Sequence, residues 1–179
     1  MKSNTITGTF FVVGALGPVI VYMLLGGVLD VLSTLQTELI ASWILLSVPI
    51  AFMRTRDTMP TGIGKEMAQI GMLLLVIGIA GGMVADSFAS VGEDASQEAI
   101  GRILWGTMFL GMSFTGLGYY LEEFFNKILS VLLGLLGCVG FLVIGIGGAT
   151  DDNVGMMIIW PLWMLVMLIL GVTTLRKAE

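Results

Sequence analysis

Residues 128–149, ILSVLLGLLGCVGFLVIGIGGA, contain no charged side chain and a single hydroxyl group, that of Ser130. A helix needs about 20 consecutive, mostly apolar residues to cross the hydrocarbon core of a bilayer. The stretch lacks the alternation of polar and apolar residues that marks a strand of a membrane barrel. Lipid also leaves the hydrogen-bonding groups of an open sheet edge unsatisfied. The stretch therefore predicts a transmembrane α-helix.

Five more segments have a similar length and composition. Their approximate ranges are 8–30, 35–53, 66–85, 99–120 and 154–175. We therefore expect one domain, residues 1–179, folded as an all-α integral membrane bundle of six transmembrane helices. The first apolar run is longer than the roughly 7–15 residues of a signal-peptide core and lacks a small-residue cleavage site, so we interpret it as a retained span.

Polar residues next to the spans predict where some of the helices begin. The second span is the least apolar, but Ser33 and Gln36 before it have the S-x-x-Q spacing of a capping box. Asp94 and Gln97 predict a similar start for the fourth helix. The sixth helix has a candidate N-cap in the pair Asp152–Asn153.

The composition fits a membrane protein and leaves little chemistry for catalysis. Of the 179 residues, 56% are hydrophobic and 12% are charged, whereas a soluble domain is about 25% charged. Histidine, the commonest general base and metal ligand, is absent. The lone cysteine, Cys138, lies in an apolar run and is interpreted as a packing residue. We expect no enzyme activity, no cofactor and, because basic residues are few, no nucleic-acid binding.

Basic residues are distributed unequally between the two sides of the predicted bundle. If all six segments cross, one side holds Lys2, Arg54, Arg56, Lys65, Lys127, Arg176 and Lys177, and the other holds only Arg102. Because loops rich in lysine and arginine stay in the cytoplasm, we expect both termini on the cytoplasmic side. The small size and the lack of N-glycosylation sequons favour the plasma membrane of a prokaryote.

The tryptophans are placed unevenly along the predicted spans. All four lie in the half of their span nearest the non-cytoplasmic side: Trp43, Trp105, Trp160 and Trp163. Because tryptophan collects at membrane–water interfaces, we interpret them as an interfacial belt.

Similar sequences recur along the chain. LVIGIAGGMVAD at 75–86 resembles LVIGIGGATDD at 142–152, and LLGGVLD at 24–30 has the same Gly-Gly pair before an aspartate. Such repeats mark many membrane folds and indicate three tandem helical hairpins of similar design. The alternative is that apolar helices of low complexity resemble one another by chance. In both cases small residues let helices approach closely. The small residues that we expect in helix–helix contacts are Gly78, Gly82, Thr107, Gly111, Thr115, Gly134 and Gly137.

Aspartates follow three of the spans on the non-cytoplasmic side. They are Asp30, Asp86, Asp151 and Asp152. If the helices bundle together, these carboxylates converge at one mouth of the bundle. Hard cations prefer oxygen ligands, so the cluster predicts a weak calcium or magnesium site, or a docking surface for a basic partner. The alternative is that short turns are simply polar where they meet water.

The sequence leaves two classes of function open. No ionisable residue lies near the centre of a predicted span, whereas proton relays and ion-coupled carriers usually have one there. This lack of chemistry and the glycine-rich spans favour a helix-packing accessory or structural subunit of a membrane complex or homo-oligomer. Its partners are then lipid and other membrane subunits or a second copy of the chain. The alternative is a small-solute transporter or channel component.

Overall fold

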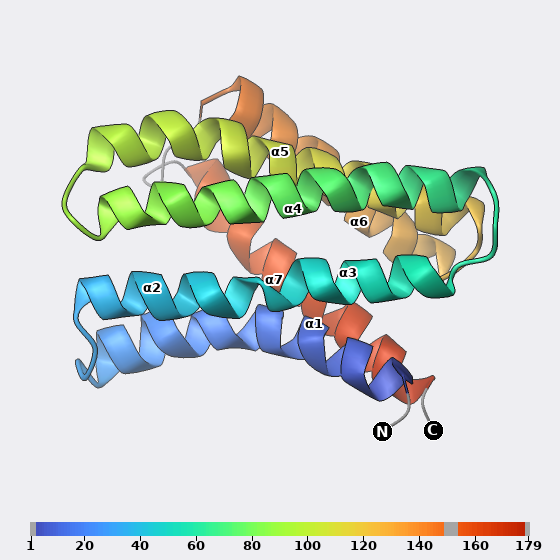
Figure 1. The fold of residues 1–179 in the computed structure, drawn as a ribbon, viewed down its shortest axis with the longest axis horizontal. Helices are drawn as coiled ribbons and strands as arrows, with labels where there is room; N and C mark the ends of the chain where they lie inside the picture. Colours follow the sequence, from blue (N-terminus) through green and yellow to red (C-terminus); the bar gives the residue numbers. More distant parts are fainter. Residues whose placement is uncertain (1–2, 149–153, 178–179) are drawn as a thin grey trace.

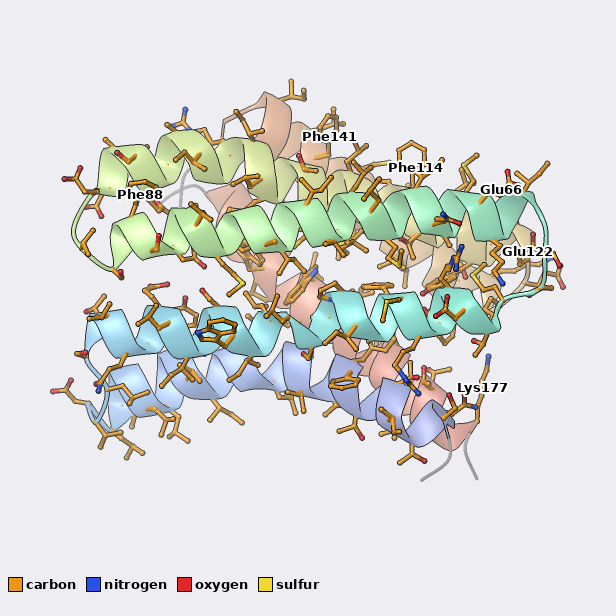
Figure 2. All side chains as sticks on the ribbon, viewed as in Figure 1. Glu66, Phe88, Phe114, Glu122, Phe141 and Lys177 are labelled. Carbon is orange, nitrogen blue, oxygen red and sulfur yellow. The ribbon has the colours of Figure 1, made fainter. Side chains whose placement is uncertain are left out.

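The computed structural model of the protein describes residues 3–148 and 154–177, which fold almost entirely into helices. In chain order they are α1 (Ser3–Val19), η1 (Ile20–Val28), α2 (Thr34–Leu45), α3 (Ser47–Thr58), α4 (Ile63–Ala89), α5 (Asp94–Leu121), α6 (Lys127–Gly140), η2 (Phe141–Ile146) and α7 (Val154–Arg176). The π-helices η1 and η2 directly continue α1 and α6, and α3 follows α2 after one residue, Leu46. The described helices therefore form six rods that lie side by side (Figure 1).

Five of the six rods are long and apolar enough to cross a membrane. They are Ser3–Val28, Thr34–Thr58, Ile63–Ala89, Lys127–Ile146 and Met157–Arg176. The rod outside this group, α5, has 28 residues and is long enough, but glycine, serine, threonine and tyrosine dilute its apolar side chains. The expectation of an all-helical chain with several membrane-type helices is therefore confirmed for the described residues.

The N-terminus of α2 carries the capping box that its sequence predicts. The Ser33 hydroxyl accepts a hydrogen bond from the Gln36 backbone N–H at 3.3 Å, and the Gln36 side chain accepts one from the Ser33 N–H at 3.0 Å. The fourth helix, α5, begins at Asp94 as the sequence predicts, but the capping box expected there is not formed. Its N-cap residue is Glu93, without a side-chain hydrogen bond, and Asp94 is already helical. A carboxylate in the first turn interacts with the helix dipole instead of capping. The candidate cap at 152–153 lies outside the described residues.

Two prolines coincide with changes in helix type. Pro49 has no N–H to donate to the Leu45 carbonyl, and the second rod is interrupted at Leu46 between α2 and α3. The first rod changes from α- to π-helical geometry at Ile20, two residues after Pro18. Such local changes of helix type absorb the lost hydrogen bond without ending the rod.

Both ends of the chain lie at the same end of the bundle (Figure 1). We call this the terminal end; it also contains the α3–α4 and α5–α6 turns. The opposite, far end contains the turns after η1 and α4. Hydrogen bonds tie the terminal end together: the Arg54 Nε donates to the Thr7 hydroxyl at 3.0 Å, and the Gly64 N–H donates to the Glu122 carboxylate at 2.9 Å. Since α4 has no capping side chain of its own, Glu122 satisfies an N–H that its first turn leaves free.

The rods do not all pack as sequential hairpins. The pair α4 and α5 packs along nearly its whole length, and α2 and α3 lie beside α1 and α4. The last two rods differ, because α6 packs chiefly against α5 and α7 packs chiefly against α1. The third of the three expected hairpins is thus not a closely packed unit, and an internal duplication stays a prediction.

Small residues lie where α4 meets α5. A Cβ added at Gly78 would lie 2.5 Å from the Met108 backbone nitrogen, and one at Gly111 would lie 2.6 Å from the Gly71 carbonyl oxygen. A Cβ at Gly82 would meet the Trp105 ring. Two hydroxyls of the predicted set bond to their own helix: Thr115 is buried and donates to Gly111, and Thr107 donates to Ile103. That these residues stabilise the bundle stays a prediction.

Gly137 and Gly134 on α6 provide a matched test of this packing prediction. A Cβ at Gly137 would lie 2.5 Å from the Ser113 nitrogen and 2.6 Å from the Phe109 oxygen, both backbone atoms that cannot rotate away. At Gly134 the nearest atom would be 3.8 Å away. We expect Gly137→Ala to cost about 1–3 kcal/mol through overpacking. Gly134→Ala should be neutral or stabilising, because alanine is the better helix former. Thermal melting of the detergent-purified variants measures both, and equal melting temperatures would contradict the prediction.

Candidate functional site

A pocket of about 520 Å³ lies at the far end of the bundle. Its lining comes from five of the six rods, all except α6 with η2. Pockets that hold small ligands usually measure about 300–1,000 Å³. Polar residues line the end of the pocket nearest the α4–α5 turn, which we call the mouth, and aromatic residues line the deeper part, which we call the floor.

Carboxylates dominate the mouth of the pocket. They come from α2, α4 and α5: Glu38, Asp86, Asp94 and Glu98. Asp86 accepts a hydrogen bond from the Ser42 hydroxyl at 3.0 Å, and Glu38 accepts one from the Tyr22 hydroxyl at 2.5 Å. Arg102, on the turn after Glu98, pairs with that carboxylate at 3.2 Å. Four carboxylates against one nearby guanidinium leave the mouth with an excess of negative charge.

Three indole rings form the floor of the pocket: those of Trp105 on α5 and of Trp160 and Trp163 on α7. The Trp105 and Trp160 ring centroids are 5.4 Å apart with the rings at 85°, and those of Trp160 and Trp163 are 5.8 Å apart at 80°. Such edge-to-face contacts are a favoured arrangement of aromatic rings. Trp105 follows Glu98 by seven helical residues, which places the floor about 10 Å below the mouth along α5.

One polar group on the floor has no partner. Trp163 is fully buried, and its indole Nε1–H makes no hydrogen bond with the described residues. Buried indole N–H groups usually find an acceptor, because an unsatisfied buried donor costs about 1–3 kcal/mol. The floor therefore combines three aromatic side chains with one buried donor that lacks an acceptor among the described residues.

The bundle is filled with apolar side chains on the terminal side of this floor. Phe109 lies one turn beyond Trp105 on α5 and contacts the Trp160 ring, with the centroids 5.7 Å apart. Further on, Phe11 packs edge-to-face on Phe52, and Phe52 stacks on Tyr119. These phenylalanines and Tyr119 are all buried. The pocket is therefore blind and ends at the tryptophans.

The structure describes two of the four aspartates that the sequence groups into one site. Asp86 lines the pocket described above, whereas Asp30 lies in a second hollow beside Ser33 and Thr37. Asp151 and Asp152 lie outside the described residues. Within residues 3–148 and 154–177, no three carboxylate or thiol side chains gather in a metal-binding arrangement. A divalent-cation or partner site on these four aspartates stays a prediction.

The tryptophans correct the expectation of an interfacial belt. Trp43 is 66% exposed on the apolar surface, as a belt residue is expected to be. Trp105 and Trp163 are buried inside the bundle, and Trp160 packs between them. The sequence contains one signal for this arrangement: three tryptophans share a depth that lies two to three helical turns below the acidic residues. Helix rotation decides whether such residues face lipid or the interior, and the spans have too few polar positions to define it.

Comparisons with known proteins add no relative. No protein-family model matches the chain, and no curated protein or solved structure matches it.

The Ser42–Asp86 hydrogen bond connects two walls of the pocket, and removing it should loosen the mouth. Ser42 is buried on α2, so Ser42→Ala leaves the Asp86 carboxylate without this donor. We expect a loss of about 1–3 kcal/mol, as for other hydrogen bonds to charged groups. Ser87→Ala is the control, because that hydroxyl is exposed and donates to the Val84 carbonyl of its own helix. Melting temperatures measure both variants, and an unchanged value for Ser42→Ala would refute this role.

Proposed function

We propose that the protein is a non-catalytic multi-pass membrane protein that acts as a helix-packing accessory or structural subunit, in a larger membrane complex or in its own oligomer. The observation that carries this proposal is the closed middle of the bundle. Phe11, Phe52 and Phe109 are fully buried there, and large apolar side chains such as Leu73 and Leu135 are more than half exposed on the outside. A packed interior with an apolar exterior suits contacts with lipid and other membrane helices.

The same proposal includes six crossings with both termini in the cytoplasm, in the plasma membrane of a prokaryote. The distribution of basic residues supports this orientation. Arg54, Arg56 and Lys65 flank the α3–α4 turn, Lys127 begins α6, and the pair Arg176–Lys177 ends α7, all at the terminal end. The far end has Arg102, which is paired with Glu98. Positive charge on one side is the main determinant of membrane orientation.

A second candidate function is small-solute binding for transport, and the far-end pocket favours it. The pocket reaches from the acidic mouth to the tryptophan floor, but buried residues such as Phe109 and Met112 fill the bundle beyond it. A transporter would have to rearrange this packed region in each cycle. The accessory role requires no such rearrangement, and we therefore favour it.

Cysteine labelling tests the six crossings, and above all the crossing by α5. Cys138 is the only cysteine, so Cys138→Ala gives a background without thiols. Val91→Cys in the α4–α5 turn should react with an impermeant maleimide in intact cells. Glu123→Cys in the α5–α6 turn should react only after permeabilisation, because α5 separates the two turns.

Thr61→Cys in the α3–α4 turn is the control for the cytoplasmic side and should behave as Glu123→Cys does. All three positions are exposed, so the bundle does not hide the introduced thiols. Labelling of positions 91 and 123 from the same side would contradict the crossing by α5.

Native electrophoresis in mild detergent tests the accessory role. Extracted from its own membrane, the chain should migrate with a larger assembly or as an oligomer, because its lipid-facing surface is the part available for helix contacts. Crosslinking in the membrane before extraction controls for dissociation by detergent. A monomer under both conditions, stabilised by a small solute, would exclude the accessory role and favour solute binding.

A further inference from the structure

We propose that the far-end pocket is a binding site for an organic cation, an amine or quaternary ammonium compound with an apolar body and a hydrogen-bond acceptor. This site does not depend on the accessory role. It follows from three features of the pocket that together match one class of ligand: the charge of the mouth, the geometry of the floor and the unpaired donor on Trp163.

The charge of the mouth selects for a cation. Glu38, Asp86, Asp94 and Glu98 line it, and the nearby guanidinium of Arg102 pairs with Glu98. Low-dielectric walls focus the field of such a cluster into the pocket. Two of the carboxylates are fixed by neighbours, Glu38 by the Tyr22 hydroxyl and Asp86 by the Ser42 hydroxyl. The negative charge is therefore held at the pocket and not on free surface chains.

The floor selects for an organic cation over a metal ion. A metal ion needs several ligands that converge, and no such group of three carboxylate or thiol side chains occurs in the described chain. The floor instead presents the indoles of Trp105, Trp160 and Trp163, with neighbouring rings nearly perpendicular. Tryptophan faces attract ammonium groups within about 6 Å, and this is how many proteins recognise quaternary ammonium ligands. Trp160, the half-buried ring of the three, provides apolar surface for the rest of the molecule.

The unpaired Nε1–H of Trp163 indicates that the ligand carries a hydrogen-bond acceptor. Trp163 lines the pocket, is fully buried and has no acceptor among the described residues. An ether, carbonyl or hydroxyl oxygen at the inner end of the ligand would satisfy it. The cationic group then lies between the carboxylates of the mouth and the Trp105 ring, which packs at Gly82, one turn of α4 from Asp86.

Ligands that differ in charge test the proposal on the unaltered protein. The probes are para-methoxyphenyltrimethylammonium and, as the matched anion, para-methoxybenzenesulfonate. Binding is followed by tryptophan fluorescence, because Trp105, Trp160 and Trp163 all line the site. We expect saturable binding of the cation with a Kd below about 1 mM and no saturable binding of the sulfonate. Equal binding of both ions, or no saturable signal with the cation, would overturn the proposal.

A pair of double variants tests the role of the mouth. Glu38→Gln/Asp86→Asn removes two charges but keeps an acceptor for Tyr22 and for Ser42. The control, Asp30→Asn/Glu93→Gln, removes two charges from the same end of the bundle, outside this pocket. We expect the first pair to raise the Kd of the cation roughly tenfold and the control to change it less than about twofold. Equal weakening by both pairs would mean that only the general charge of the far end matters, and would overturn the site.

Trp163→Phe tests the acceptor, because phenylalanine keeps an aromatic ring but has no N–H. The affinity for the para-methoxy probe should fall roughly fivefold. The para-ethyl analogue, which has no acceptor oxygen, should bind the variant and the unaltered protein alike. This second probe also reports whether the variant keeps its fold. Equal losses of affinity for the two probes would show that Trp163 does not donate to the ligand. The ligand would then need no acceptor.

Discussion

Backbone hydrogen bonding in lipid is the constraint on which the rest of the structure depends. The hydrocarbon core offers no partner to an N–H or C=O group, so each rod satisfies these groups within itself. Only the N–H and C=O groups at the rod ends lack partners within the rod, and side chains form hydrogen bonds with them there. Gln36 and Ser33 cap α2, Asn126 accepts from the Ile128 N–H at the start of α6, and Glu122 reaches across from α5 to α4. The charged side chains are therefore concentrated at the two ends of the bundle.

The same constraint shapes how the rods meet. Between helices in lipid the hydrophobic effect contributes little, so association depends on close contact. The backbones of α4 and α5 approach each other at Gly78 and Gly111, where an added Cβ would meet backbone atoms. These two helices carry Asp86 at the mouth of the pocket and Trp105 at its floor. The contact between α4 and α5 thus fixes the relative position of the acidic mouth and the aromatic floor.

Helix positions could be predicted from the sequence because they depend on local properties. Length and hydropathy predicted most ends of the six rods to within a few residues, and the Ser33–Gln36 spacing predicted the start of α2. The pocket could not be predicted, because it depends on how each rod is rotated. In a soluble helix, polar residues identify the outer face; here both faces are apolar. Trp43 and Trp163 therefore lie in similar apolar sequence, yet the Trp43 side chain is 66% exposed and the Trp163 side chain is fully buried. The role of Asp94 could not be predicted for a similar reason. A helix that begins one residue earlier turns Asp94 from an N-cap residue into a carboxylate of the first turn.

The location of the pocket at one end follows from the cost of charge in lipid. A carboxylate near the bilayer centre is expensive unless it is paired or hydrated, so a charged recognition site has to open toward water. Glu38, Asp94 and Glu98 all lie within the first two turns of their helices, and Asp86 lies in the last turn of α4. The aromatic floor can lie deeper, because burying indole rings costs no charge. A site with charge at the mouth and aromatic rings beneath it is therefore the arrangement that a closed bundle can hold, and extending the same chemistry through the middle would require polar groups where Phe11, Phe52 and Phe109 now pack.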